Sequence, residues 1–455
     1  MKSNEILIVD GIYCKAGKKL VKPISDCLQY KTASWRQGRY GMKKKDRTAY
    51  KIDRRSNRFL AGLLSRVERY LKKSNIKYQV VGELEKLYPE RKPKVKGIKL
   101  RPDQISLIRK AITNQKGVII SPTGSGKTVL IMGIMSAFPR AKILFLCHTL
   151  DLINQTLEEF QAKGFKDIQV ITGDEKKVIL KKSRIVVSTI QSFSNISPEH
   201  YYDLFDITFC DEAHHCNSID SQYGKVMSKN LSPIKIGMTA TLPNSIPEKM
   251  DLEGLIGPVV GELTMEEGME FGIIVKPKVV LIPVPRTSLL SNHTRYAKVY
   301  EHCIVNNRSR NTSIVKETAK RVKEGKTVLI MVKEIAHGKL LVALGKRLKV
   351  DFEFVRGMTD SKTRLMIKNK LNDKKIKAVI STAVWREGLN IPTLNCVINA
   401  CSGKSDVLTM QIPGRALRTS EGKGEVEIID FLDPYKYLAE HAISRIQVYA
   451  KKGWL

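Results

Sequence analysis

Apolar residues follow one rhythm along most of the chain: short apolar runs alternate with amphipathic stretches from residue 100 onward. This alternation is typical of a parallel α/β domain, in which buried strands are joined by helices. We expect a helix between each successive pair of strands. The first series predicts strands at Val118–Ile120, Ile143–Cys147, Ile168–Ile171, Ile185–Ser188, Ile207–Cys210 and Lys235–Met238.

A second series of the same kind begins beyond a boundary that we expect between Gly272 and Pro277. Before residue 100, apolar positions from Phe59 to Leu71 recur at helical spacing and predict a helix that buries one face. The stretch from Pro89 to Lys99 lacks a period and has the Pro and Lys content of a linker. The strands predicted in the second series are Thr327–Val332, Phe352–Val355, Ala378–Ser381, Cys396–Asn399 and Glu425–Ile429.

The length of 455 residues is too great for one core and suggests about three domains. The fold class predicted is α/β, with two tandem parallel-sheet domains and a small basic N-terminal α+β domain. We place the domains at residues 1–95, 96–272 and 273–455.

The net charge of the chain indicates what kind of partner it binds. The chain has 79 Lys and Arg against 45 Asp and Glu, which gives a net charge of +34 and favours nucleic acid as a polyanionic partner. Residues 1–95 hold 25 of these cations and only 9 of the acids. We expect cations near the aromatic Tyr50 to contact DNA phosphates, although a solvated loop is an alternative. They are Lys43, Lys44, Lys45, Arg54 and Arg55.

Eight scattered cysteines form no C-x-x-C pair, so neither a zinc site nor a disulfide framework is indicated. No apolar run approaches the length of a membrane span. We therefore expect a cytoplasmic protein that is neither secreted nor bound to a membrane.

The residues from Ser121 to Thr128 stand between a predicted buried strand and a helix, as a phosphate-binding loop does. Gly124 and Gly126 allow the backbone to turn and to approach an anion closely. Lys127 would reach the β and γ phosphates of a nucleotide, and the Thr128 hydroxyl would bind Mg²⁺. Thr123 and Ser125 complete the loop.

Two adjacent carboxylates, Asp211 and Glu212, follow the strand that ends at Cys210. Such a position is the carboxyl edge of a sheet, where α/β proteins bind ligands. Asp211 would hold Mg²⁺ through water, and Glu212 would polarise the attacking water. A metal site at His214, His215 and Cys216 is disfavoured because no second ligand pair has a suitable spacing.

With these motifs the chain resembles the superfamily 2 DExH helicases, here with a DEAH motif, over roughly residues 100 to 430. The resemblance implies two tandem RecA-like domains, ATP and Mg²⁺ as cofactors, and Gln104 as the residue that reads adenine. It places Thr149, Thr189 and Gln191 at the nucleic-acid backbone. It also implies that His214, Thr239 and Thr241 couple hydrolysis to movement.

The second half resembles the remaining motifs of the family. Thr382 would contact nucleic acid and Gly388 would lie at the nucleotide, whereas Trp385 could stack on a base or belong to the core. The string from Gln411 to Arg418 resembles the motif that carries the arginine fingers. Arg415 and Arg418 are three apart, so one helix face could direct both at the γ-phosphate.

Two further strings, Phe59–Val67 and Asn306–Asn311, are similar to the phage branch-migration helicases of the UvsW type, including the helicases of T5-like phages. The resemblance implies an ATP-dependent DNA helicase that unwinds or branch-migrates forks, Holliday junctions and D-loops. It would act as a monomer beside recombination or replication proteins. An RNA helicase, the motor subunit of a restriction-type complex and an ATP-switched regulator without turnover remain alternatives.

Overall fold

The computed structural model describes residues 1–38, 41–122, 124–173, 180, 183–273, 275, 277–286, 295–382, 385, 391, 393–403 and 426–455. The chain divides into two compact units. The first holds Met1–Pro122 and Gly126–Thr264, and the second holds Thr123–Ser125 and Met265–Leu455. The domain boundaries predicted at residues 95 and 272 stay predictions.

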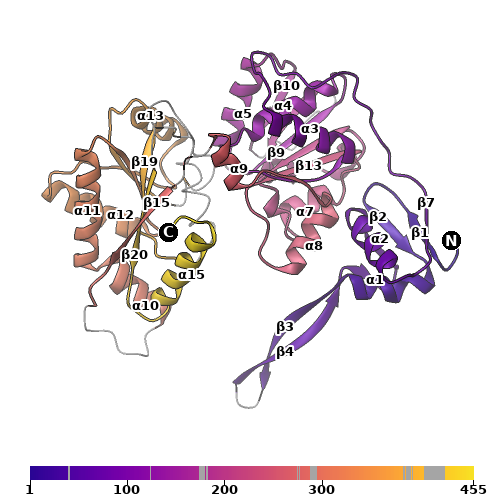
Figure 1. The fold of residues 1–455 in the computed structure, drawn as a ribbon, viewed down its shortest axis with the longest axis horizontal. Helices are drawn as coiled ribbons and strands as arrows, with labels where there is room; N and C mark the ends of the chain where they lie inside the picture. Colours follow the sequence, from indigo (N-terminus) through magenta and orange to yellow (C-terminus); the bar gives the residue numbers. More distant parts are fainter. Residues whose placement is uncertain are drawn as a thin grey trace. The chain divides into compact units, whose positions relative to one another are not determined.

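The N-terminal region forms a small sheet of its own, with α1 (Val21–Cys27) and α2 (Leu64–Lys73) packed against each other (Figure 1). The α2 face that carries Val67 and Leu71 is buried, as the helical spacing predicts. Phe59 and Leu60 lie in a strand and not in this helix, so the helical period begins later than predicted. The order of the strands is β5 (Ile52–Asp53), β6 (Arg58–Leu60), β2 (Tyr13–Ala16), β1 (Glu5–Ile8) and β7 (Gln79–Val81).

A long hairpin is inserted into this region. Strands β3 (Gln29–Gly38) and β4 (Gly41–Tyr50) pair antiparallel from Gln29 opposite Tyr50 to Gly38 opposite Gly41. Figure 1 shows the hairpin extending away from the five-stranded sheet. Lys43, Lys44 and Lys45 pair in register with Arg36, Trp35 and Ser34 of β3.

Seven parallel strands form the first large sheet over the described residues. The inner strands β9, β11 and β13 are apolar runs that are buried throughout, because a parallel sheet is covered on both faces. Their order is β10 (Ile168–Ile171), β11 (Ile185–Thr189), β9 (Ile143–Cys147), β12 (Ile207–Asp211), β13 (Ile234–Thr239), β8 (Lys116–Ile120) and β14 (Val259–Glu262).

The helices of this sheet differ in how deeply they are buried. Helix α4 (Lys127–Ala137) is apolar all round and buried from Leu130 to Ala137, as expected for a helix enclosed by protein. Its neighbours are amphipathic or short. They are α3 (Pro102–Asn114), α5 (Leu150–Ala162), α6 (Ile190–Phe193), α7 (Gln222–Met227) and α8 (Ile246–Leu255).

The N-terminal sheet packs tightly on α8. A Cβ on Gly62 would lie 2.1 Å from the Glu253 carbonyl oxygen, and one on Gly254 would lie 2.7 Å from Leu60 Cδ1. Arg66 Nε donates a hydrogen bond to Glu253 at 2.8 Å, and Lys51 pairs with Asp251 at 2.6 Å. One continuous apolar core therefore joins the N-terminal sheet to the first parallel sheet.

The stretch predicted as a linker is also held in place. Glu90 N–H donates to the Ala137 carbonyl at 2.9 Å, and Lys94 N–H donates to Ser136 Oγ at 2.9 Å. Arg91 Nε donates to the Ser136 carbonyl at 2.7 Å. The stretch has no regular secondary structure, yet these bonds fasten it to the last turn of α4.

Six parallel strands form the sheet of the second unit over the described residues, around a separate apolar core. Their order is β15 (Pro277–Pro283), β20 (Val426–Leu432), β19 (Leu394–Asn399), β16 (Thr327–Met331), β18 (Ala378–Ser381) and β17 (Glu353–Val355). The helices are α9 (Met265–Glu270), α10 (Tyr296–Tyr300), α11 (Arg308–Lys323), α12 (Ile335–Arg347), α13 (Ser361–Asn372) and α15 (Leu438–Lys451).

The predicted α/β class with two parallel sheets and an α+β N-terminal region is confirmed, and every predicted strand is present with small changes of its ends. Strands β14 and β15 were not predicted, because their runs lie where the alternation weakens. The helix expected between β10 and β11 falls partly on residues 174–179 and 181–182, outside the described residues. No helix in the described part of the chain is long and apolar enough to cross a bilayer.

Candidate nucleotide and nucleic-acid site

Three predicted motifs meet at one edge of the first sheet. Strands β12, β13 and β8 are neighbours, and all three run parallel. Their registers set Asp211 opposite Met238 and Thr239 opposite Ile120. The carboxyl ends of parallel strands form the ligand edge of an α/β sheet, so the loops after these strands face one site.

The loop after β8 has the backbone that an anion site needs. Gly124 and Gly126 have φ values of 91° and 94°, a region that residues with a Cβ rarely adopt. Gly126 is the N-cap of α4, whose eleven residues begin at Lys127. The N-terminus of such a helix presents backbone N–H groups and a partial positive charge to an anion. Lys127 and Thr128 in its first turn are half-buried. Thr123 lies outside the described residues.

Gln104 lies against this loop. Its side chain is 3% exposed, and its Oε1 accepts a hydrogen bond from the Arg101 N–H at 3.2 Å. A Cβ on Gly126 would lie 2.9 Å from Gln104 Nε2, so this side chain lies directly against the loop. The structure therefore brings together the predicted adenine-reading residue and the predicted phosphate loop.

A chain of contacts connects the carboxylate motif to that loop. His214 Nδ1 lies 3.5 Å from Glu212 Oε2 and 3.0 Å from Thr239 Oγ1. The Thr239 hydroxyl donates to the Thr241 carbonyl at 2.7 Å, so it accepts from His214. The Ser121 N–H donates to the Thr239 carbonyl at 2.8 Å.

Glu212 itself has an unusual backbone. Its φ is 49°, in the left-handed region, although its side chain is only 5% exposed. A bulky residue held in this conformation costs free energy and commonly marks a functional position. Asp211, the last residue of β12, is half-buried beside it.

The cysteines and histidines near this edge are engaged in packing. Cys216 Sγ lies 3.6 Å from Cys210 Sγ, and the His215 ring stacks on His148 with centroids 4.6 Å apart. Burial raises the pKa of the Cys147 and Cys210 thiols, which favours their protonated form. His214 and Cys216 thus contact different partners, which gives no support to a metal site at this triplet.

The residues predicted to touch nucleic acid lie at the carboxyl ends of β9 and β11. Thr149 is the N-cap of α5, where its Oγ1 accepts from the Leu152 N–H at 3.3 Å. Thr189 caps α6 and is 5% exposed, and its hydroxyl also donates to Ser192 Oγ at 2.9 Å. Gln191 is exposed. The Thr189 hydroxyl is therefore already hydrogen-bonded to Ser192, whereas Gln191 and the N-terminus of α5 are more exposed to solvent.

The basic N-terminal residues are only partly engaged. Lys43, Lys44 and Lys45 lie in β4 of the hairpin. The Arg54 guanidinium lies 3.7 Å from the centroid of the Tyr50 ring, and Arg55 is exposed. The aromatic partner proposed for these cations thus packs on Arg54 itself.

In the second unit Thr382 follows β18, where its N–H donates to the Val355 carbonyl at 3.1 Å, and it is 7% exposed. Trp385 is 3% exposed, which favours a core role over stacking on a base. The other predicted residues of this unit lie outside the described residues. They are Gly388, Gln411, Arg415 and Arg418.

Sequence reasoning missed a buried network around Arg310. This side chain is fully buried; its Nε donates to Asp433 at 2.9 Å and its Nη2 donates to Ser402 Oγ at 2.6 Å. The Ser402 hydroxyl in turn donates to Asp433. The signal was present in the Asn306–Asn311 string, which was used only as a family resemblance.

Arg445 forms a second such network. Its Nε donates to Asp430 Oδ2 at 2.7 Å, its Nη1 to the Gly403 carbonyl at 3.0 Å, and Tyr449 O–H also donates to Asp430 at 2.9 Å. Gly403 and Val426 flank residues 404–425, the segment that carries the predicted arginine fingers. The two arginines therefore hold the chain at both ends of that segment.

Family models match both halves of the chain. Residues 97–244 match the model described as "Type III restriction enzyme, res subunit", and residues 309–420 match "Helicase conserved C-terminal domain". These ranges contain the predicted motifs of the first sheet and of the second half, respectively.

Among curated relatives, the chain is similar to the "ATP-dependent DNA helicase uvsW" of Enterobacteria phage T4. The two are 25% identical over 382 residues, which cover 76% of this chain and 74% of that protein. It is also 25% identical to the "Probable helicase D10" of Escherichia phage T5 over 384 residues, which cover 83% of this chain and 81% of that one.

A solved structure of an ATP-dependent Type ISP restriction-modification enzyme, LlaBIII, bound to DNA has a similar fold. Its TM-score is 0.58 at 17% identity, and the match covers 79% of this chain and 30% of that chain. A fragment of an HsdR subunit of a type I restriction enzyme from Vibrio vulnificus YJ016 matches with a TM-score of 0.56 at 18% identity, over 74% of this chain and 64% of that one. At these identities the likeness concerns the fold.

Proposed function

The chain belongs to the superfamily 2 helicases, and from that premise we propose that it is an ATP-dependent DNA helicase that unwinds or branch-migrates forked and other branched DNA. The observation that carries the proposal is the contact chain from Glu212 through His214 and Thr239 to Ser121. It gives the carboxylate motif a physical connection to the phosphate loop, as a motor that couples hydrolysis to movement requires.

In this proposal ATP with Mg²⁺ supplies the γ-phosphoryl group whose transfer to water drives movement. The α4 N-terminus and Lys127 would neutralise the phosphates. Thr128 and Asp211 would hold the Mg²⁺, and Gln104 would face the adenine. The backbone fits these roles, because the positive φ of Gly124 and Gly126 opens the loop to an anion.

Glu212 would act as the base that orients the attacking water. His214 would report the state of that carboxylate, because its Nδ1 proton is shared between Glu212 and Thr239. Thr239 and Thr241 would pass the change along the loop after β13. From the second half of the chain, Gln411, Arg415 and Arg418 would stabilise the charge that develops on the γ-phosphate, and Gly388 would line the nucleotide.

On the nucleic-acid side, Thr149, Gln191 and Thr382 would contact the backbone of one strand, with Thr189 shaping its loop. The hairpin residues Lys43, Lys44 and Lys45, with Arg54 and Arg55, would bind a duplex arm. DNA is favoured over RNA as substrate because the T4 relative, matched over 74% of its length, is named a DNA helicase. Recombination or replication proteins would be its partners.

ATP turnover and unwinding of the full-length chain test the proposal. Lys127→Ala should lower single-strand-stimulated kcat by at least about 10²-fold, since the loop loses its side-chain cation. Glu212→Gln should retain ATP binding and lose hydrolysis, because an amide keeps the shape of the carboxylate but cannot act as a base. Near-normal turnover in either variant would overturn the site.

Comparing DNA and RNA substrates in the same assay distinguishes the DNA helicase from the alternative functions. Forked DNA should be unwound faster than a matched RNA fork, and replacing Lys43, Lys44, Lys45, Arg54 and Arg55 by Ala should slow fork unwinding while sparing ATPase on single strands. Faster unwinding of the RNA fork would favour the RNA helicase. ATP binding without any turnover on DNA or RNA would favour a switched regulator.

A further inference from the structure

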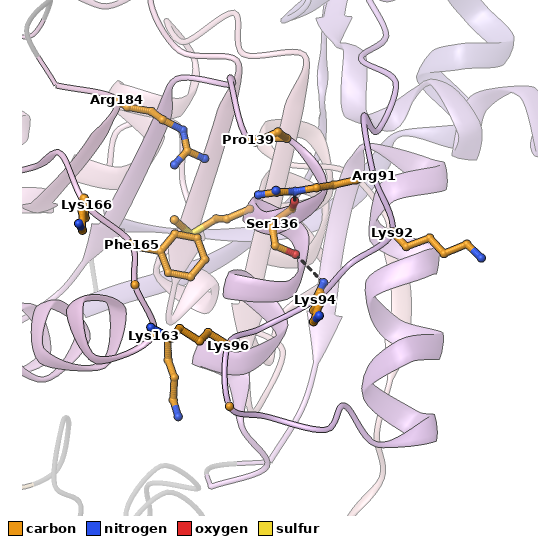
Figure 2. A pocket seen from close by; sticks show the side chains of 13 residues that line it. Arg91, Lys92, Lys94, Lys96, Ser136, Pro139, Lys163, Phe165, Lys166 and Arg184 are labelled. Carbon is orange, nitrogen blue, oxygen red and sulfur yellow. Dashed lines mark hydrogen bonds between the residues drawn. The ribbon is translucent and has the colours of Figure 1, made fainter.

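A basic cavity of about 600 Å³ lies in the first unit, near the amino ends of β10 and β11 (Figure 2). Its lining has seven Lys and Arg side chains and no Asp or Glu. Lys163 and Lys166 come from the turn between α5 and β10, and Arg184 immediately precedes β11. The other four come from residues 91–96, in the stretch fastened to α4.

The charge in this cavity is poorly compensated. Arg184 Nη2 donates to the Phe138 carbonyl at 3.2 Å, but its buried Nε has no hydrogen-bond partner among the described residues. Burial, followed by repulsion from Arg91, lowers the pKa of the Arg184 guanidinium, although Asp167 and Glu90 oppose the shift. Cations held together in this way destabilise the fold unless an anion joins them.

The two nearby acids are engaged elsewhere. Asp167 Oδ2 accepts the backbone N–H of Arg184 at 2.8 Å, and Glu90 pairs with Arg140 at 3.4 Å. Neither side chain lines the cavity. The cavity therefore has the charge complement of a phosphate group and not of a cation or an apolar ligand.

The cations are presented from a fixed backbone. The bonds of Arg91 and Lys94 to Ser136 hold the 91–96 stretch against the end of α4. Figure 2 shows Arg91 and Arg184 directed toward the cavity from opposite sides, while Lys92 extends away from it. Two guanidinium groups held at fixed positions suit phosphate oxygens, which accept paired hydrogen bonds from such forks.

An aromatic ring lies among these cations. Phe165 lines the cavity and packs on Phe160 with ring centroids 5.7 Å apart. It is only partly buried, so part of the ring stays accessible. Phosphate-binding cations beside an accessible ring are the combination with which proteins hold nucleic-acid strands.

The cavity is well separated from the predicted strand track. Thr149 is the N-cap of α5, Lys163 directly follows its C-terminus, and the helix between them has thirteen residues. At about 1.5 Å per residue this helix spans roughly 20 Å. A strand that contacts the carboxyl edge of the sheet therefore leaves the cavity open to a different segment of nucleic acid.

We propose that this cavity binds the phosphate backbone of a second DNA segment, such as one arm of a fork, while the carboxyl edge of the sheet holds the strand that stimulates ATP hydrolysis. The inference rests on the DNA helicase function proposed above. It adds a substrate contact on the first unit that is independent of the hairpin.

A charge-reversal pair tests the cavity in the full-length protein. Lys163→Glu/Lys166→Glu removes two of its cations, and Lys225→Glu/Lys229→Glu, at exposed positions of the same unit, changes the net charge equally. Binding of forked and single-stranded DNA is measured by anisotropy over a salt series. Each duplex phosphate contact contributes roughly 0.9 to the slope of log K against log salt, so the cavity variant should lose up to about 1.8 on forks.

On single strands the cavity variant should match the control variant, and its ATPase at saturating single strand should be unchanged. Equal slopes and affinities on forks for the two variants would overturn the inference. Equal losses on forks and single strands would show that the cavity extends the strand track, which also overturns a second-segment site. Failure of the proposed function is distinct, because the unsubstituted protein would then lack DNA-stimulated ATPase.

Discussion

The two parallel sheets differ in where their polar residues lie. In the first, polar groups occupy loops at the carboxyl edge, where Glu212, His214 and Thr239 contact one another around a glycine-rich turn. In the second, Arg310 and Arg445 are buried, and each is paired with an aspartate of or just beyond β20. The first sheet thus gathers polar contacts at its carboxyl edge, whereas the second unit buries charged pairs in its interior.

The largest effect expected from this comparison is on the stability of the second unit. Arg310→Met should lower its free energy of unfolding by about 3–5 kcal/mol, because Asp433 would remain buried without its cation. Urea unfolding followed by a probe in the second unit measures the change. Lys127→Ala, in the loop of the first sheet, should leave the unfolding midpoint nearly unchanged while it removes turnover.

Arg308→Met is the matched control, since Arg308 lies on the same helix but is exposed. It should change the free energy of unfolding by no more than about 0.5 kcal/mol. If Arg310→Met were as mild as this control, the buried pair would be dispensable and the contrast between the two sheets would fail.

The same contrast explains what the sequence could predict. Strands such as Ile143–Cys147 are visible because burial on both faces of a parallel sheet demands a continuous apolar run. Motif resemblance predicted that Gln104 reads adenine, because the residues of such motifs lie close together in the sequence. Its contact with Gly126 was not predicted. Arg310 and Arg445 escaped prediction because a charged residue gives no sign in the sequence that a partner 123 or 15 residues away will bury it.

The N-terminal region shows the same limit. Its charge and helical period were readable, but its docking on α8 depends on the close approach of Gly62 to Glu253. A single glycine does not alter the hydrophobic period of a sequence, so the approach of Gly62 to Glu253 could not be predicted from it.

A smaller effect is expected at this docking contact. Gly62→Ala should destabilise the first unit by about 1–3 kcal/mol, because the added Cβ would lie 2.1 Å from the Glu253 carbonyl oxygen and the backbone must move. Limited proteolysis and urea unfolding report the change. Gly357→Ala in the second unit has nothing within 4 Å of its Cβ and should be close to neutral. If the urea unfolding midpoints of Gly62→Ala and Gly357→Ala were equal, the backbone at the docking contact would accommodate the added Cβ without loss of stability.

The smallest expected effect is a pH dependence of the same docking. Lys116 is largely buried, and its Nζ donates to the Gly11 carbonyl at 2.8 Å, which ties the first parallel sheet to the N-terminal region. Burial lowers the pKa of Lys116 to about 8, although Cys14, Asp10 and Glu85 oppose the shift. The fully buried Lys235 nearby also has a lowered pKa, by burial and by repulsion from Lys116.

Because the folded-state pKa of Lys116 lies below the unfolded value, the folded chain binds fewer protons between about pH 8 and 10. The contribution of Lys116 to the free energy of unfolding should therefore rise with pH through this window, by about 1–2 kcal/mol between pH 8 and 9.5. Urea unfolding of the unsubstituted protein, of Lys116→Met and of the exposed control Lys110→Met measures this slope. The difference in free energy of unfolding between the unsubstituted protein and Lys116→Met should grow by this amount from pH 8 to 9.5, whereas the difference to Lys110→Met should stay constant. Three parallel curves would assign the pH dependence to other groups and leave Lys116 as a simple hydrogen-bond donor between the two parts of the first unit.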